Sequence, residues 1–442
     1  MVALITVTHS IIDAGLARFP RPEEVLAGYA VAKSIATVLE NPLFMVRQTT
    51  VALVKDRRSY HMVRTSVLGL TLFFCGLIAA VAYIPPLTQL FLREIMGLEG
   101  AAFAQARSAL ALMPFLPIAT GWRNFQQGLA ILREGNDLLP VATLFRLLYL
   151  VVFMFGVAPH LGIGGALAGS AGFVGGLVVE MLVMALGLRV LLRRQKADFL
   201  SEEAPPAKDE SEEGGRLTWR GLAEFFVPLA LTSLIMTGTL PLVNGFIARG
   251  HLPEVALAAY AVALSVGNTL VNPINMLHQV SLAFVDPSDP RSVARVRSFF
   301  ARVALFFAAL IALVAFTPFG TWLLLGPMGL PPRVAAPAQS CLGFFILIAL
   351  ASAVREYVWG VLLQARRTGG IGGAKAATTL VMAVILAGGL ALYPGHMAIV
   401  AAASLAAGAI VEAALLVGYT RQAARPRQAP PGAKVTAPGA AR

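Results

Sequence analysis

Long apolar segments alternate with short polar ones along most of this chain. Because about 20 apolar residues cross the hydrocarbon core of a bilayer, each long segment predicts a membrane-spanning helix. The segments run over 25–54, 66–84, 107–132, 138–158, 163–192, 222–247, 254–285, 302–325, 334–364, 374–393 and 396–419. A twelfth, Val2 to Ala17, is shorter than its counterpart, which begins at Leu222. We therefore expect the first helix to be truncated, with residues missing before Met1.

The hydrophobic pattern repeats when the chain is shifted along itself by 231 residues, by 233 where Leu72 to Phe74 meets Leu305 to Phe307, and by 232 from Arg123 onwards. The aligned pairs include Asp13 with Asn244, Tyr29 with Tyr260, Pro42 with Pro273, Arg123 with Arg355, and Glu180 with Glu412. A fixed internal period is the mark of a duplicated architecture. The pattern predicts an all-α membrane protein of twelve transmembrane helices, built as two six-helix bundles. Because each copy has an even number of helices, the two repeats are parallel.

The duplication divides the chain into four regions. The N-lobe, with helices one to six, covers 1–196, and the C-lobe, with helices seven to twelve, covers 217–420. Between them, 197–216 is rich in Asp, Glu, Pro, Ser and Gly, which is typical of a solvated linker. The remaining residues, 421–442, are rich in Ala, Pro, Gly and Arg and are expected to form a disordered basic tail.

Basic residues are concentrated in the loops that follow even-numbered helices. They include Lys55, Arg57, Arg58, Arg64, Arg133, Arg189, Arg193, Arg291, Arg295, Arg366, Arg367 and Arg421. Because Lys and Arg favour the cytoplasmic side of short loops, we expect a multi-pass protein of a bacterial-type inner membrane with both termini in the cytoplasm. The net charge of +12 is mostly this asymmetry. Membrane lipids, and not nucleic acid, are therefore the expected surroundings.

Composition and missing motifs narrow the function classes. With 57% hydrophobic and 13% charged residues, the chain has too few polar groups to cover a soluble globule. It contains no Gly-x-x-x-x-Gly-Lys-Ser/Thr loop, no His-Glu-x-x-His and no Gly-x-Ser-x-Gly. Its two cysteines each lie inside an apolar segment and cannot form a zinc ligand set. We expect a monomer that is neither an enzyme nor a metalloprotein.

Two opposite charges recur together inside the predicted spans. Arg123 and Glu180 lie on the fourth and sixth helices, and Arg355 and Glu412 repeat them in the second copy. A charge at the bilayer centre costs about 2.5 to 3.5 kcal/mol on insertion scales unless it faces protein or water. Each pair is interpreted as a structural ion pair within its lobe, with a role in transport as the alternative. If Arg123 and Glu180 are only a structural pair, reversing both charges together should restore the stability lost in either single variant, and failure of that rescue would favour the transport role.

Polar side chains recur at helical spacing in the second and eighth helices, and Pro42 and Pro273 interrupt both stripes at equivalent points. Two such stripes, one from each lobe, predict a water-filled substrate cleft between the lobes. The alternative is packing through interhelical hydrogen bonds. The candidate cleft residues are Lys33, Thr37, Glu40, Asn41, Arg47 and Gln48 in the N-lobe, and Asn244, Asn268, Asn272, Asn275, His278 and Gln279 in the C-lobe.

Several short motifs resemble the multidrug and toxic compound extrusion (MATE) transporters of the multidrug/oligosaccharidyl-lipid/polysaccharide (MOP) flippase superfamily. They are Ile11 to Arg18, Leu26 to Ala30, and the Arg-to-Gly stretches Arg123 to Gly128 and Arg355 to Gly360. The resemblance implies two bundles around a central cavity and secondary active export of a small organic solute by alternating access. It also implies that Asp13 binds the coupling ion, H⁺ or Na⁺, with no other cofactor.

A narrower resemblance concerns the cargo. Val227 to Leu231 and Pro241 to Asn244 are similar to the progressive ankylosis (ANK) branch, which implies export of organic anions such as citrate, pyrophosphate or nucleotides. Lys33, Arg47 and Arg146 would suit an anion, since a buried cation requires a partner. The further alternatives are multidrug antiport, a flippase for lipid-linked saccharides and, in another class, a membrane scaffold without transport activity or an intramembrane enzyme.

Overall fold

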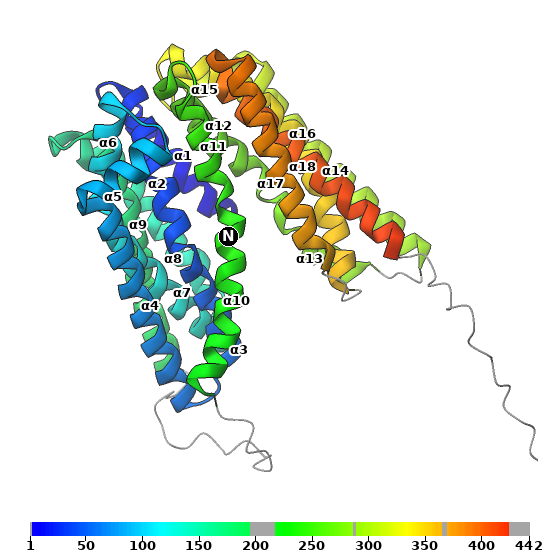
Figure 1. Ribbon diagram of the computed structural model, residues 1–442. Helices are drawn as coiled ribbons and strands as arrows, with labels where there is room; N and C mark the ends of the chain where they lie inside the picture. The colour runs from blue at the N-terminus through cyan, green and yellow to red at the C-terminus, as the bar shows by residue number, and fades with distance from the viewer. Residues whose placement is uncertain (1, 195–216, 286–288, 365–368, 424–442) are drawn as a thin grey trace, which may run out of the picture.

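The computed structural model describes residues 2–194, 217–285, 289–364 and 369–423. In these ranges every regular element is a helix. The helices form two bundles that meet at one end of the molecule and diverge towards the other (Figure 1). The predicted linker, 197–216, and all but the first three residues of the predicted tail lie outside the described residues.

The N-lobe contains the elements of the first repeat. They are α1 (Val2–Leu16), α2 (Pro22–Glu40), η1 (Asn41–Phe44), α3 (Met45–Leu53), α4 (Arg57–Tyr83), α5 (Pro85–Gln89), η2 (Leu90–Ile95), α6 (Gly100–Leu110), η3 (Met113–Phe115), α7 (Leu116–Leu132), α8 (Leu138–Val151), η4 (Val152–Val157), η5 (Ala158–His160) and α9 (Gly165–Arg194).

The C-lobe contains the elements of the second repeat. They are α10 (Trp219–Thr237), α11 (Thr239–Ala248), α12 (Pro253–Val271), η6 (Ile274–Met276), α13 (His278–Phe284), α14 (Pro290–Phe316), α15 (Pro318–Leu325), α16 (Pro332–Gln364), α17 (Gly369–Leu392), η7 (Pro394–His396) and α18 (Met397–Ala423).

Nine helices in the described ranges are long and apolar enough to cross a membrane. Three further passes are α1, which is short, and the pairs α2–α3 and α10–α11, each of which is interrupted. The interruption in the second pass is the 3₁₀ segment η1, with Pro42 near its start. A proline removes a backbone hydrogen bond and ends regular helix. Together these elements give the predicted twelve passes in two repeats.

The largest differences from the predicted spans are at the starts of two helices. Helices α4 and α14 begin at Arg57 and Pro290, well before the apolar segments that start at 66 and 302. The carboxylates of Asp56 and Asp289 cap these two helices, so the polar residues just after each cap are helical as well. The segment 302–325, predicted as one span, is divided, because Thr317 leaves the helix and caps α15.

Backbone geometry repeats along with the sequence. Arg21 and Leu252, which precede the prolines that begin α2 and α12, have φ of 52° and 51°. Gly97 and Gly329 follow the short helices η2 and α15 and have φ of 72° and 67°. A non-glycine residue rarely occupies this left-handed region. Its presence at equivalent places in both lobes indicates that the turns were inherited with the duplication.

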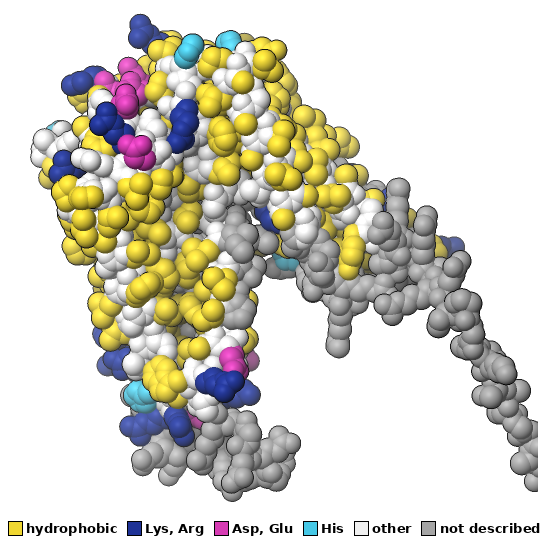
Figure 2. Space-filling model, in the orientation of Figure 1, with side chains coloured by type: hydrophobic (Ala, Val, Ile, Leu, Met, Phe, Trp, Pro, Cys, Tyr) yellow, Lys and Arg dark blue, Asp and Glu magenta, His cyan; other side chains and the backbone are white. Residues whose placement is uncertain are grey.

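The face drawn in Figure 2 carries a broad area of apolar side chains. Leu72 and Phe73 on α4 are 61% and 62% exposed, and their repeat counterparts Leu305 and Phe306 on α14 are 62% and 59% exposed. Equivalent large apolar side chains therefore face outward in both lobes, where a bilayer would cover them. The chain is a multi-pass membrane protein.

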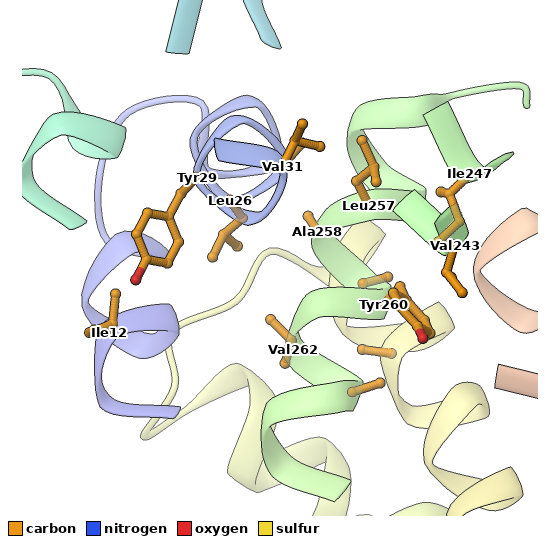
Figure 3. Packing of buried hydrophobic residues seen from close by; sticks show 14 of the residues in the cluster. Ile12, Leu26, Tyr29, Val31, Val243, Ile247, Leu257, Ala258, Tyr260 and Val262 are labelled. Carbon is orange, nitrogen blue, oxygen red and sulfur yellow. The ribbon is translucent and has the colours of Figure 1, made fainter. Parts of the chain in front are cut away.

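The two lobes share one apolar core where they meet. Leu26 and Val31 of α2 face Leu257 and Ala258 of α12 across this junction (Figure 3), and all four are buried. Helix α10 belongs to the second repeat but lies beside α3 of the N-lobe (Figure 1). The lobes are thus packed against each other through apolar side chains at one end, and they are separated at the other end. Figure 2 shows the hollow between them.

Candidate functional site

A cavity of about 320 Å³ lies between the lobes. Helices α1 and α2 form its N-lobe wall, and α11 and α12 form its C-lobe wall. Its lining residues are His9, Ala30, Lys33, Thr37, Leu240, Asn244, Tyr260, Ala261, Leu264, Ser265, Asn268 and Asn272. Apolar walls with a few convergent polar groups are typical of small-molecule sites.

The charge on the N-lobe wall comes from Lys33. Its ammonium lies 5.3 Å from the centre of the Tyr29 ring, within the range of a cation–π contact. The Asp13 carboxylate, on α1, attracts it electrostatically. Lys33 thus faces the cavity with one carboxylate close to it.

Four buried polar atoms beside this wall have no hydrogen-bond partner within the described structure. They are Thr8 Oγ1, His9 Nδ1, Asp13 Oδ2 and the Tyr29 hydroxyl. Asp13 is only 1% exposed, and leaving such a group unsatisfied is costly. His9 and Asp13 are four residues apart on α1 and so share one face. We call these four groups of α1 and α2 the α1–α2 polar cluster; their oxygen and nitrogen atoms are of the type that binds a small cation or a proton.

The C-lobe wall is neutral and rich in carboxamides. Asn272 Oδ1 accepts a hydrogen bond of 2.9 Å from Asn275 Nδ2, and Asn275 Oδ1 accepts one of 2.8 Å from Arg355 Nη2. Arg355 in turn contacts Glu356 at 2.9 Å, and Glu356 lies 2.7 Å from His278 Nδ1. A chain of polar side chains therefore runs from the cavity into the charged interior of the C-lobe.

Five of the predicted cleft residues line the cavity: Lys33, Thr37, Asn244, Asn268 and Asn272. Asn275 and His278 are not part of the lining; they belong to the hydrogen-bonded series of side chains that begins at Asn272. Gln48 is exposed and outside the lining, and the side chain of Gln279 lies outside the described structure.

Three predicted cleft residues are directed elsewhere. Glu40 is 1% exposed and accepts a hydrogen bond of 2.9 Å from Thr120 on α7, inside the N-lobe. Asn41 donates to the Ser233 carbonyl of α10 at 2.6 Å, so it binds the lobes together. Arg47 contacts Gln127 at 3.5 Å. In this structure these side chains do not line the cavity, because helices other than α12 cover their part of the α2–α3 pass.

Three polar residues of the lining were not among the candidate cleft residues. His9 lies four residues before Asp13, and this spacing could have revealed it. Ser265 belongs to the polar stripe of the eighth helix, and Tyr260 is the repeat counterpart of Tyr29. A tyrosine inside an apolar run is more often a core residue than a ligand, so only the structure distinguishes the two roles.

The predicted ion pairs have more members than two. Glu180 Oε2 lies 3.1 Å from Arg123 Nη1 and 2.7 Å from Arg146 Nη1, and all three side chains are buried. In the C-lobe, Glu412 Oε2 is 3.9 Å from Arg355 and 3.3 Å from Lys375. The presence of Arg146 beside Glu180 changes the expected result of the charge reversal. Reversing Arg123 and Glu180 together would place an arginine against Arg146, so this swap should not restore stability.

Comparison with known proteins supports the fold but gives no close relative. No protein-family model and no curated protein matches the chain. An inward-facing multidrug resistance MATE family transporter of the MOP superfamily has a TM-score of 0.64 at 13% identity, over 96% of this chain and 94% of its own. The lipid II flippase MurJ, in an inward closed conformation, has a TM-score of 0.66 at 10% identity, over 94% of this chain and 85% of its own.

The eukaryotic MATE transporter AtDTX14 has a TM-score of 0.59 at 15% identity, over 95% of this chain and 93% of its own. At these identities the likeness establishes the fold alone. The predicted MATE-type fold of two six-helix repeats is confirmed.

Proposed function

We propose that this protein is a secondary active transporter that moves a small polar organic solute across a bacterial-type inner membrane by alternating access. The observation that carries the proposal is the cavity, because each lobe supplies one of its walls. A site divided between two rigid bundles opens to one side or the other as the bundles rock. The similar folds of MATE transporters and MurJ support the same function.

The orientation of the protein is part of the proposal. Arg57 and Arg58 lie at the start of α4 and Arg220 at the start of α10, and both helices start at the end where the lobes diverge (Figure 1). By the positive-inside rule this end faces the cytoplasm, which would make the structure an inward-facing state. Both termini would then be cytoplasmic.

Asp13 is proposed to carry the coupling ion, H⁺ or Na⁺. Its carboxylate is buried, one of its oxygens has no partner in the described structure, and it belongs to the α1–α2 polar cluster. Binding of a cation to Asp13 would cancel the charge that attracts Lys33. Since Lys33 lines the cavity, the state of Asp13 would alter the electrostatic field that the solute meets. This gives a physical route from the ion to the cargo.

An anionic cargo is the second candidate, because Lys33 is the one Lys, Arg, Asp or Glu in the described lining of the cavity. Citrate, pyrophosphate, nucleotides and the pyrophosphate of a lipid-linked saccharide share the chemistry that Lys33 would bind. A cationic drug would instead be repelled by Lys33 and drawn to Asp13. A thermal-shift screen of organic anions against cationic drugs distinguishes these classes, because a bound ligand stabilises the folded protein.

Lys33→Ala is expected to weaken binding of the best anion from that screen by about 30-fold or more, since removing one partner of a buried charge contact costs about 2–5 kcal/mol. The dissociation constant is measured by titration calorimetry. Lys55→Ala removes an exposed lysine near α4 and serves as the matched control. Unchanged anion affinity in Lys33→Ala would remove the anion candidates, and substrate-dependent flux into proteoliposomes tests the transporter itself.

A further inference from the structure

We call the end where the two lobes meet the closed end, and the end where they diverge the open end. At the closed end, two arginine side chains reach from one lobe to the other. Arg18 follows α1 in the N-lobe, and its Nη2 donates to the Pro327 carbonyl of the C-lobe at 2.6 Å. Its Nη1 lies 3.5 Å from the Met328 carbonyl. Arg249 follows α11 in the C-lobe, and its Nη2 donates to the carbonyls of Glu94 and Ile95 in the N-lobe, at 2.8 and 2.9 Å. The two contacts run in opposite directions across the same junction.

The contacts are equivalent under the internal repeat. Arg18 and Arg249 are 231 positions apart, and Ile95 and Pro327 are 232 apart. Each arginine is also anchored within its own lobe by Nη1, which donates to the carbonyl four residues earlier, Ala14 or Gly245. Each arginine therefore bonds to the end of the helix that precedes it and, across the junction, to the opposite lobe.

The acceptors stand at the ends of short helices. Glu94 and Ile95 are the last residues of η2, and Pro327 lies just beyond α15. The final carbonyls of a helix have no partner within it and carry its partial negative charge, so a guanidinium is a favourable cap. When the lobes separate at this end, η2 loses the donor that caps its last carbonyls, and the turn after α15 loses the donor to its Pro327 carbonyl.

Two glycines make room for the arginines. A Cβ at Gly97 would lie 3.2 Å from Arg249 Cγ, and one at Gly329 would lie 3.4 Å from Arg18 Cγ. Both glycines have positive φ, so a side chain would be strained there as well as crowded. The turn after each short helix is thus shaped to admit the arginine of the other lobe.

A repulsive contact at the same end acts against the arginines. Glu254, in the first turn of α12, is close enough to Glu23 and Glu24 of α2 to repel them electrostatically. Glu254 and Glu23 are themselves repeat counterparts. Since like charges meet where the lobes close, the closed end has both an attractive and a repulsive polar element. Such a balance makes a contact that can open and close.

We propose that Arg18 and Arg249, with the carbonyls of 94–95 and 327–328, form a two-fold arginine latch that holds this end shut and sets the balance between the two states of the transporter. The latch rests on the proposed alternating-access function. Its role is separate from solute binding, because both guanidiniums lie outside the cavity lining. Breaking it selectively destabilises the state in which the closed end is shut.

The latch is tested by distances between spin labels, measured in detergent by double electron–electron resonance. In a Cys75→Ser, Cys341→Ala background, one label pair replaces Ala104 and Ala336 near the closed end, and another replaces His61 and Ala294 at the open end. These four positions are exposed, and each pair joins one lobe to the other. The pairs are compared in the parent, in Arg18→Ala, in Arg249→Ala and in the double variant.

Each single variant is expected to shift the ratio of the two states about fivefold, the size of an exposed charged hydrogen bond, and the double variant more. In these variants, the distance between the labels at 104 and 336 should lengthen, and the distance between the labels at 61 and 294 should shorten. Arg93→Ala is the matched control, because Arg93 is exposed and pairs within its own lobe with Glu99 at 3.7 Å. Lysine at 18 and 249 should recover part of the parental distribution, which separates lost donors from misfolding.

Parental distances at both ends in the double variant overturn the latch. This readout needs neither a solute nor an ion gradient, so it fails independently of the transport proposal. Shifted distances in a protein that transports no tested solute would leave the latch standing and count against the function.

Discussion

Asp13→Asn is expected to abolish ion-driven accumulation of the solute in proteoliposomes. Asparagine keeps the size of the side chain but can neither take up a proton nor balance a bound Na⁺. Coupling between two ligands is typically about 5- to 150-fold in affinity, and this factor should fall to one. Downhill flux through the cavity should persist, because Lys33 and the asparagines that line the cavity remain. Uptake of labelled solute with and without an imposed gradient measures both quantities.

Glu224→Gln is the control for this experiment. Glu224 is an exposed acid on α10 that pairs with Arg220 at 2.8 Å, so its loss should leave coupling intact. Gradient-dependent accumulation that survives in Asp13→Asn would place the coupling ion elsewhere. Loss of downhill flux as well would indicate that Asp13 is required to hold the cavity together, and binding of the solute to the variant would then be checked directly.

Glu180→Gln is expected to lower the free energy of unfolding by about 3–5 kcal/mol, the cost of leaving a buried charge without its partner. Two guanidiniums depend on this one carboxylate, at 3.1 and 2.7 Å, and Glu180 is 1% exposed. Nε and Nη2 of Arg146 already lack partners in the described structure, so little else is available to neutralise them. Reversible unfolding in mixed detergent micelles, followed by circular dichroism, provides the measurement.

The repeat supplies a matched control, Glu412→Gln. Glu412 is the counterpart of Glu180, but its basic partners Arg355 and Lys375 are 17% and 30% exposed and lie at 3.9 and 3.3 Å. Partly hydrated pairs contribute about 1 kcal/mol or less, so this variant should lose much less stability. Equal losses in the two variants would contradict the different environments of the two clusters.

The duplication explains why so much of the fold was predictable from sequence. Apolar length defined the spans, and the constant shift between the copies fixed their order and direction. The ends of the helices were harder to predict, because each end depends on single hydrogen bonds. Asp56 extends α4 by capping it, and Thr317 divides a continuous apolar run by starting α15. Hydropathy averages over many residues and is insensitive to one cap.

In the N-lobe, the cavity lining was predictable only where the helix is regular. Lys33 and Thr37 lie on unbroken α-helix and do line it. Beyond Glu40 the chain enters four residues of 3₁₀ helix, which turns by about 120° per residue instead of about 100°. By Arg47 the stripe has therefore rotated by about 80° relative to the extrapolated face. Glu40 itself follows the period but meets Thr120 of α7, since periodicity does not say which neighbour covers a face.

The symmetry of the arginine latch has a consequence for how the protein arose. In a half-length ancestor that paired with itself about a two-fold axis, one arginine per subunit would have produced both contacts, because an isologous interface uses every residue twice. Arg18 and Arg249 still occupy such equivalent places. Fusion of the two genes would have preserved the closure while releasing Asp13 and Asn244 to diverge. Self-association would thus have preceded the specialised chemistry of either half.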